Sequence, residues 1–311
     1  MNGPFERSFE MTYAVHLEPL SAAAKQVHIW IPLAASNRHQ TIQRRIIQAP
    51  VPYRITRDPE YGNDILFLDL RELKRPLDLA IRYETLVREE ALLASTEILP
   101  PDTLPDSAKS LYLKSGSAMV VNRAIRDLAQ RVTAGAATST EKARAIYRYV
   151  IERMTYEKET PGWGNGDTLR ACAVGAGNCT DFHSLFISLA RAVGIPARFE
   201  IGLLFPDKPE GDIPGYHCWA SFYLPGKGWI PVDASEAWKH REKVDYFFGT
   251  YDPNRLELSN GRDIELIPRP ASGPRNIFFF PYAEADGKAV AKDRIKTEFK
   301  FRGLEVKNDN V

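Results

Sequence analysis

The stretch that decides the fold runs from Gly177 to Arg198 and has the sequence Gly-Asn-Cys-Thr-Asp-Phe-His-Ser-Leu-Phe-Ile-Ser-Leu-Ala-Arg-Ala-Val-Gly-Ile-Pro-Ala-Arg. Apolar residues recur in it at intervals of three and four, which predicts a helix with one buried face. The residues of that face are Leu185, Phe186, Leu189, Ala190 and Val193. Gly194 is expected to end the helix, and a strand is expected to follow at Ile195.

Cys179 is thereby predicted at the beginning of this helix. Unpaired backbone N–H groups and the positive end of the helix dipole favour a negative charge at that position. A thiolate is stabilised there, so the pKa of the thiol falls and the sulfur becomes a usable nucleophile. The other interpretation is a cysteine that only fills space in the core.

A cysteine nucleophile needs a base, and the base needs a group that orients it. His217 follows Cys179 by 38 residues, at the start of a predicted strand. Asp233 lies 16 residues after His217, at the end of the next predicted strand. Most chains contain these residue types, so their placement at the ends of elements, rather than their presence, favours a catalytic arrangement.

The connection between these two strands is constrained by side-chain alternation. With a four-residue loop from Pro225 to Gly228, Ala220 would pair with Asp233, and His217 would then lie on the opposite face of the sheet. A shared face requires the offset to change by one residue. We therefore predict a β-bulge or a loop with an odd number of residues.

The length and net charge of the chain limit the number of domains and the kinds of partner that we expect. A chain of 311 residues holds one large or two ordinary domains, and its net charge of +1 gives no electrostatic case for nucleic acid or an anionic membrane as partner. No apolar run approaches the ~18 residues of a membrane span. The start, Met1 to Glu10, lacks an apolar signal core. We expect a cytoplasmic protein, or a periplasmic or secreted one if a signal peptide has been removed.

The three cysteines, Cys172, Cys179 and Cys218, argue against a disulfide framework because their number is odd and small. They lack paired C-x-x-C spacing, and the six histidines form no H-E-x-x-H motif. We therefore expect neither a metal nor a cofactor. Cys172 is expected to be structural and Cys218 to belong to the core.

The first part of the chain has the pattern of β-structure. Between residues 6 and 90, short alternating segments are separated by turn signals, which predicts an antiparallel sandwich. The proline-rich stretch 99–106 is the expected boundary. We predict a β-sandwich domain over 1–105 and a second domain, with C-terminal strands, over 106–311.

The second part mixes helices and strands. Apolar spacing predicts helices near 121–132 and 139–154. The glycine-rich segment 160–177 is expected to be a loop that wraps the mouth of a cleft beside Cys179. Residues 295–302 alternate between apolar and charged side chains, which predicts a late, partly exposed strand.

At this point four segments together resemble the bacterial transglutaminase-like superfamily. They agree with it in order and spacing, and the resemblance covers about residues 110 to 280: Gly177–Phe186, Arg191–Arg198, Tyr216–Ala220 and Gly228–Asp233. The resemblance implies an α+β fold, in which an N-terminal antiparallel β-sandwich precedes a papain-like core of helices packed on an antiparallel sheet. It also implies Cys179 as nucleophile, His217 as general base and acid, and Asp233 as the group that orients the imidazole.

The resemblance further implies a cysteine-dependent amide-bond enzyme that needs no cofactor. Its thiolate would attack a peptide bond or a glutamine-type carboxamide in a peptide or protein substrate, and an acyl-enzyme would form. Water would resolve it in a peptidase or deamidase, and an amine in a transglutaminase; hydrolysis is favoured because water is always present. The alternative is a protein that kept the fold without turnover and acts in binding or scaffolding.

Some similar proteins use an upstream glutamine or tryptophan to stabilise the oxyanion, but no glutamine occurs between Gln130 and Cys179. Trp163, Asn165 and Asn178 are therefore candidates for contacts with the substrate or the oxyanion, beside the backbone N–H of Cys179. His183, four residues after Cys179, is expected to have a hydrogen-bonded structural role rather than a substrate contact.

Overall fold

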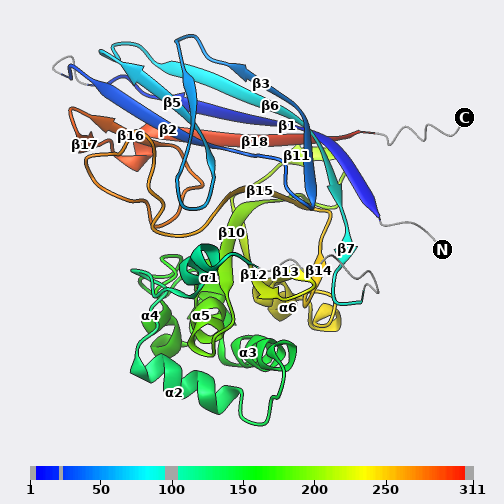
Figure 1. Cartoon of the computed structure of the whole chain (residues 1–311). Coiled ribbons are helices and arrows are strands. Elements are labelled where there is room, and N and C mark those ends of the chain that lie inside the picture. The colour runs from blue at the N-terminus through cyan, green and yellow to red at the C-terminus, as the bar shows by residue number, and fades with distance from the viewer. Residues whose placement is uncertain (1–4, 21–23, 95–103, 305–311) are drawn as a thin grey trace, which may run out of the picture. The chain divides into compact units, whose positions relative to one another are not determined.

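The computed structural model describes residues 5–20, 24–94 and 104–304 (Figure 1). The chain divides into two compact units, each assembled from separated segments. The first unit comprises Met1–Glu89, Ile201–Tyr216 and Pro253–Val311, and the second comprises Glu90–Glu200 and His217–Asp252.

The first unit is an antiparallel β-sandwich of two five-stranded sheets, as the labelled strands in Figure 1 show. One sheet has the order β11 (Glu210–Asp212), β18 (Ile295–Leu304), β1 (Glu6–Leu17), β6 (Leu77–Arg88) and β3 (Gln40–Gln48). The other has the order β17 (Lys288–Ala289), β16 (Tyr282–Ala285), β2 (Val27–Leu33), β5 (Asp64–Leu70) and β4 (Arg54–Arg57). The end of β10 pairs with β15 (Arg255–Asn260) in this unit, which also contains the 3-10 turn η2 (Lys292–Arg294).

The sandwich core follows from the alternation in its strands. Every second residue of β1 from Phe9 to Leu17 is buried, and its neighbour β6 repeats the pattern, so the two strands present one continuous apolar face. On the second sheet, Trp30 and Phe67 pack with Ile264 in a buried cluster. The Trp30 indole N–H donates to the carbonyl of Pro268 at 2.9 Å, so this large side chain is buried with its polar atom satisfied.

The division into units differs from the predicted single boundary near residue 105. Strand β18 pairs with β1 along ten residues, from Ser8 with Leu304 to Leu17 with Ile295, so the C-terminal strands lie in the sandwich and not with the residues that follow 106. Alternation identifies β18 as a strand, but it carries no information about the partner strand. Most of the proline-rich stretch 99–106 lies outside the described residues.

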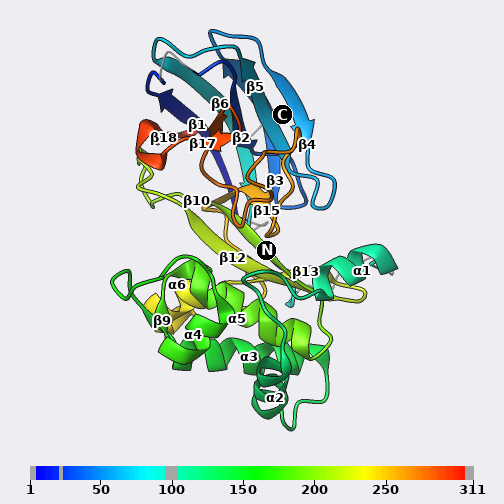
Figure 2. The same cartoon turned by 90° about the vertical axis from the view of Figure 1, so that its left-hand side faces the viewer.

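The second unit packs helices on a sheet that contains β13, β12 and β10 in that order (Figure 2). Its helices are α1 (Asp106–Leu113), α2 (Arg123–Val132), α3 (Ser139–Arg153), α4 (Thr168–Val174), α5 (Cys179–Ala192) and α6 (Ala234–Lys239), followed by the 3-10 turn η1 (Arg241–Lys243). Its strands are β7 (Glu90–Ala91), β8 (Thr155–Tyr156), β9 (Ala176–Gly177), β10 (Ala197–Leu204, shared with the first unit), β12 (His217–Leu224), β13 (Gly228–Val232) and β14 (Thr250–Tyr251). None of the helices described is both long and apolar enough to span a bilayer. The predicted α+β fold class is confirmed.

Helix α5 lies at the centre of this unit. It contacts α2, α3, α4 and α6 as well as β12, and every residue from Cys179 to Arg191 is buried (Figure 2). A capping box begins it: the Asn178 side chain accepts from the first turn, and the Asp181 carboxylate accepts the Asn178 N–H. These local hydrogen bonds therefore determine where the helix begins, independently of its packing.

The connection between β12 and β13 confirms the predicted odd-length loop. Leu224 pairs with Gly228 and Ala220 pairs with Val232, so three residues, 225–227, form the turn. Continued by one step, this register sets Trp219 opposite Asp233, and His217 lies two residues further along the same face. The geometry needed for His217 to meet Asp233 thus follows from loop length.

The segment 160–177, predicted to be a loop, contains helix α4. The Asp167 carboxylate begins it by accepting from the N–H groups of Leu169 and Arg170, and Gly175 ends it in the left-handed conformation with φ of 70°. Both signals are present in the sequence, but the helix has seven residues and too few apolar positions for its periodicity to show.

Candidate active site

Cys179 is the first residue of α5 and is almost completely buried, with 2% of its surface exposed. The side-chain oxygen of Asn178 accepts the Thr180 N–H at 2.9 Å and so satisfies one of the unpaired donors at this helix end. Helix geometry leaves the N–H of Cys179 without an intrahelical acceptor. The sulfur therefore sits where the helix favours negative charge.

His217 and Asp233 form a buried pair. The two side chains meet at 2.6 Å, between His217 Nε2 and Asp233 Oδ2. The second oxygen, Oδ1, accepts the N–H groups of Ser235 at 3.1 Å and Glu236 at 2.8 Å, which caps α6. Because one oxygen of Asp233 is held by a helix and the other by the imidazole, neither group is free to rotate.

The thiol and the imidazole shift each other's proton affinity. Burial raises the pKa of Cys179, but hydrogen bonds with Cys218 and His217, together with the charge on His217, outweigh it and hold that pKa well below its ordinary value. Burial lowers the pKa of His217, but the charge of Asp233 and its hydrogen bond, with a contribution from Cys179, raise it to about 9. Near neutral pH these directions favour a thiolate beside an imidazolium.

Cys218 is in the core, where it was expected, yet it contacts the helix start. Its sulfur lies 3.6 Å from Thr180 Oγ1 and 3.9 Å from His183 Nδ1. Burial raises the pKa of Cys218, and the hydrogen bond to Cys179 adds to this, so its thiol keeps the proton that it shares with the Cys179 sulfur. Burial also raises the pKa of Cys172, on α4.

Asp181 is a residue whose role the sequence analysis missed. Its buried carboxylate accepts N–H groups from Gly164 at 2.7 Å, Gly166 at 3.1 Å and Asn178 at 3.0 Å. A Cβ on Gly177 would collide with this carboxylate, so glycine is required there. Asp181 ties the glycine-rich loop to the start of α5; its place as the third residue of the helix and the run of glycines upstream were the available signals.

The three substrate or oxyanion candidates lie in this loop and at the helix start. Trp163 is 37% exposed and directly precedes Gly164, whose N–H donates to Asp181. The Asn165 side-chain amide donates to the Gly162 carbonyl at 3.3 Å. The side-chain oxygen of Asn178 is committed to the helix cap, as described above.

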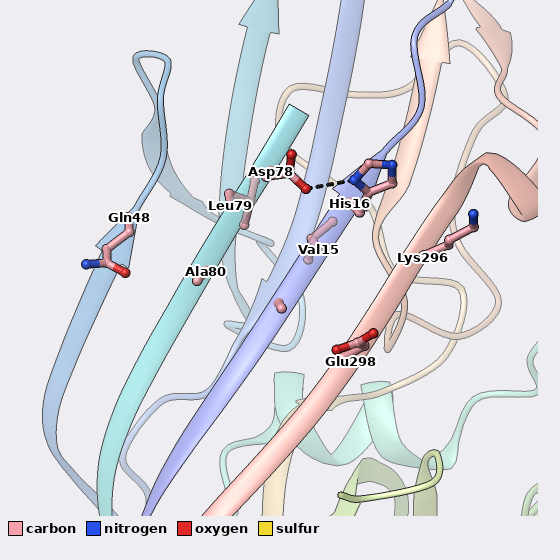
Figure 3. A pocket seen from close by; sticks show the side chains of 9 residues that line it. Val15, His16, Gln48, Asp78, Leu79, Ala80, Lys296 and Glu298 are labelled. Atoms are coloured by element: carbon pink, nitrogen blue, oxygen red, sulfur yellow. Dashed lines mark hydrogen bonds and ion pairs between the residues drawn. The ribbon is translucent and has the colours of Figure 1, made fainter. Parts of the chain in front are cut away.

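A hollow of about 640 Å³ lies elsewhere, on the outer face of the first sheet of the sandwich (Figure 3). Ala14 and Ala80, which pair across β1 and β6, line it, as do His16 and Asp78, whose side chains are 2.7 Å apart. No cysteine lines it. Among the residues that the structure describes, no group of three or more His, Cys, Asp or Glu side chains is arranged to hold a metal ion.

Comparison with known proteins finds a family model that matches the part of the chain containing this site. Residues 126–234 match the model of the transglutaminase-like superfamily, which confirms the predicted resemblance. An uncharacterized protein of Haemophilus influenzae is 28% identical in an alignment that covers 94% of this chain and 89% of that protein.

A solved structure shares the fold of this chain. A protein of Cytophaga hutchinsonii, provisionally described as a cysteine protease, superposes with a TM-score of 0.65 at 15% identity, covering 97% of this chain and all of that chain. The periplasmic domain of TgpA from Pseudomonas aeruginosa gives a TM-score of 0.39 at 15% identity, over 76% of this chain and 90% of that one. At such identities the likeness to the first of these concerns the fold alone.

Proposed function

We propose, from the match of residues 126–234 to the transglutaminase-like superfamily model, that this chain is a cysteine-dependent amide-bond enzyme with Cys179, His217 and Asp233 as its catalytic residues. One observation supports this most strongly. The His217–Asp233 contact of 2.6 Å is buried beside a cysteine whose pKa is lowered by the same imidazole. The proposed substrate is a peptide bond or a glutamine-type carboxamide in a peptide or protein.

The first step uses the thiolate. Cys179 Sγ attacks the carbonyl carbon, the carbonyl π electrons move to oxygen, and a tetrahedral intermediate forms. The backbone N–H of Cys179, without an acceptor in the helix, is the proposed donor to that oxyanion. Trp163 and Asn165 are proposed to contact the substrate here, because Asp181 anchors their loop to the same helix turn.

The second step expels the amine. The oxyanion collapses, the C–N bond breaks, and His217 gives its proton to the departing nitrogen, which leaves a thioester on Cys179. Since Nε2 is bound to Asp233, Nδ1 is the ring nitrogen that exchanges this proton. Asp233 stabilises the imidazolium before the transfer and keeps the ring oriented afterwards.

The acyl-enzyme is then resolved by a nucleophile that His217 deprotonates. With water, the thioester becomes a carboxylate and the thiolate–imidazolium pair is restored, which makes the protein a peptidase or a deamidase. With a primary amine, a new amide forms and the protein is a transglutaminase. We propose hydrolysis, because water reaches the thioester without a binding site of its own.

Incubation of the full chain with a mixed peptide library and a primary amine, read by mass spectrometry, separates these reactions. Cleaved peptides, deamidated glutamines and amine adducts are distinguishable products, and we expect the first or second with the wild type and none with Cys179→Ala. Limiting iodoacetamide near pH 6 should alkylate Cys179 before Cys172 or Cys218. An inert Cys179 and no product would refute the enzyme and favour a binding or scaffold protein.

A further inference from the structure

A second histidine, His183, is buried between the nucleophile and the start of α6. It lies one helical turn after Cys179 with no exposed surface. Its Nδ1 is 2.7 Å from the carbonyl oxygen of Cys179, and its Nε2 is 3.1 Å from the backbone nitrogen of Ala234. One imidazole thus spans from the residue that carries the thiol to the residue after Asp233.

These two contacts determine which ring nitrogen carries the proton. The Ala234 N–H can only donate, so Nε2 accepts and bears no hydrogen. A carbonyl oxygen can only accept, so Nδ1 bears the hydrogen and donates it to Cys179. The ring is therefore a neutral imidazole whose polar atoms are both paired, as complete burial requires.

The groups that face His183 agree with this assignment. From its own helix it meets the Cys179 carbonyl, from β12 the Cys218 sulfur at 3.9 Å, and from α6 the Ala234 N–H. Asp233 Oδ1 lies 3.5 Å from Nε2, while its own hydrogen bonds come from the first turn of α6. Asp233 Oδ1 therefore already accepts hydrogen bonds from α6 and does not require a proton on Nε2 of His183.

We propose that His183 is a positioning residue, whose Nδ1 and Nε2 contacts hold the Cys179 backbone and the Asp233–Ala234 peptide at a fixed separation. The inference rests on the proposed function, since it assigns the residue that aligns the two halves of that site. The Asp233–Ala234 peptide determines where the Asp233 side chain starts. Its Oδ1 then caps α6 while Oδ2 meets His217, so a shift of this peptide loosens the His217 contact.

Two substitutions separate the two contacts. In His183→Gln, the side-chain oxygen can take the place of Nε2 and accept from Ala234; in His183→Asn, the amide can take the place of Nδ1 and donate to Cys179, but nothing reaches Ala234. The measurement is the rate of Cys179 alkylation by iodoacetamide between pH 4 and 10, which needs no turnover.

We expect His183→Asn to move the acid limb of the alkylation profile to higher pH and to slow alkylation near pH 6 about tenfold, because a loosened Asp233 holds less positive charge on His217. The facing groups that set this limb are His217 from β12, Cys218 beside it, and Asp233 behind the imidazole. His183→Gln should keep the wild-type profile.

The matched control is Ser188→Ala, a buried position on the same helix whose hydroxyl is 2.8 Å from Thr168 Oγ1. It should lower Tm without moving the acid limb. If His183→Asn lowers Tm but leaves the limb where it is, or if both His183 variants move it equally, the inference is wrong. Turnover by the wild type and its loss in Cys179→Ala would still support the proposed function.

A measurement on the wild type keeps the test open should the asparagine variant fail to fold. Long-range proton–nitrogen NMR correlations of the imidazole rings report which nitrogen is protonated. We expect the proton of His183 to lie on Nδ1, with no hydrogen on Nε2. An Nε2–H form would overturn the proposal.

Discussion

Replacing Asp233 by Asn removes a charge from the site while keeping the shape of the side chain. An asparagine still offers Oδ1 to the N–H groups that begin α6, so the helix cap remains. Its other end becomes an amide that can only donate, and Nε2 of His217 must then accept. The remaining proton moves to Nδ1, where it blocks transfer from Cys179.

The size of the effect follows from the pKa of His217, which rises from its ordinary 6.5 to about 9 in the fold. That rise corresponds to about 3 kcal/mol in favour of the protonated form, as the net result of Asp233 and Cys179, which raise the pKa, and burial, which lowers it. Because the folded value is the higher one, the stabilisation is fully present below pH 6.5 and is lost as the pH rises through about 9.

The assay is urea unfolding of wild type and Asp233→Asn at pH 6 and pH 10. We expect the variant to be less stable by up to ~3 kcal/mol at pH 6 and by much less at pH 10. Turnover should fall by ~200-fold, the rate equivalent of the same free energy, and less completely than in His217→Ala, which lacks the base altogether.

The matched control makes the same substitution at a helix cap without an imidazole. Asp167 begins α4 as Asp233 begins α6, so Asp167→Asn should change stability equally at both pH values. A stability difference for Asp233→Asn that does not depend on pH, together with an unchanged alkylation profile of Cys179, would refute the coupling described here.

Three further predictions follow from neighbouring contacts. Cys218→Ala should raise the pKa of Cys179, because a hydrogen bond to the thiolate is lost, and the alkylation profile should move to higher pH; an unmoved profile contradicts this. Asp181→Asn should speed amide hydrogen exchange of the loop glycines that donate to it and lower kcat/KM, whereas unchanged protection would show that the carboxylate does not hold the loop. One residue inserted after Gly226 should turn Asp233 to the other face of the hairpin, so Cys179 should no longer be alkylated rapidly near pH 6. Alkylation near pH 6 at the wild-type rate would contradict this prediction.

The local sequence pattern predicted where helices and strands lie better than it predicted which strands pair with each other. The helices near 121–132 and 139–154 correspond to α2 and α3, since their apolar spacing is a property of the segment itself. The odd loop between β12 and β13 could be predicted because it follows from a single requirement on His217 and Asp233. The pairing of β18 with β1 could not, because alternation is the same whichever strand lies beside it.

The roles around Cys179 divide in the same way. Cys179, His217 and Asp233 could be proposed from the sequence because each stands at the end of a helix or strand, a position that local pattern predicts. Asp181 and His183 act through contacts with a loop and with α6 that no local pattern contains. The catalytic roles of Cys179, His217 and Asp233 are predictions for the experiments above.

The pairing of β1 with β18 has a consequence for synthesis on the ribosome. Strand β1 is translated before β6 and can pair with it early, but its other edge stays open until β18 has been translated, nearly 300 residues after β1. Through most of elongation the nascent chain therefore presents an unpaired row of backbone donors and acceptors, which is a template for aggregation. We therefore expect a chaperone that covers this edge until β18 has been translated to raise the yield of folded protein.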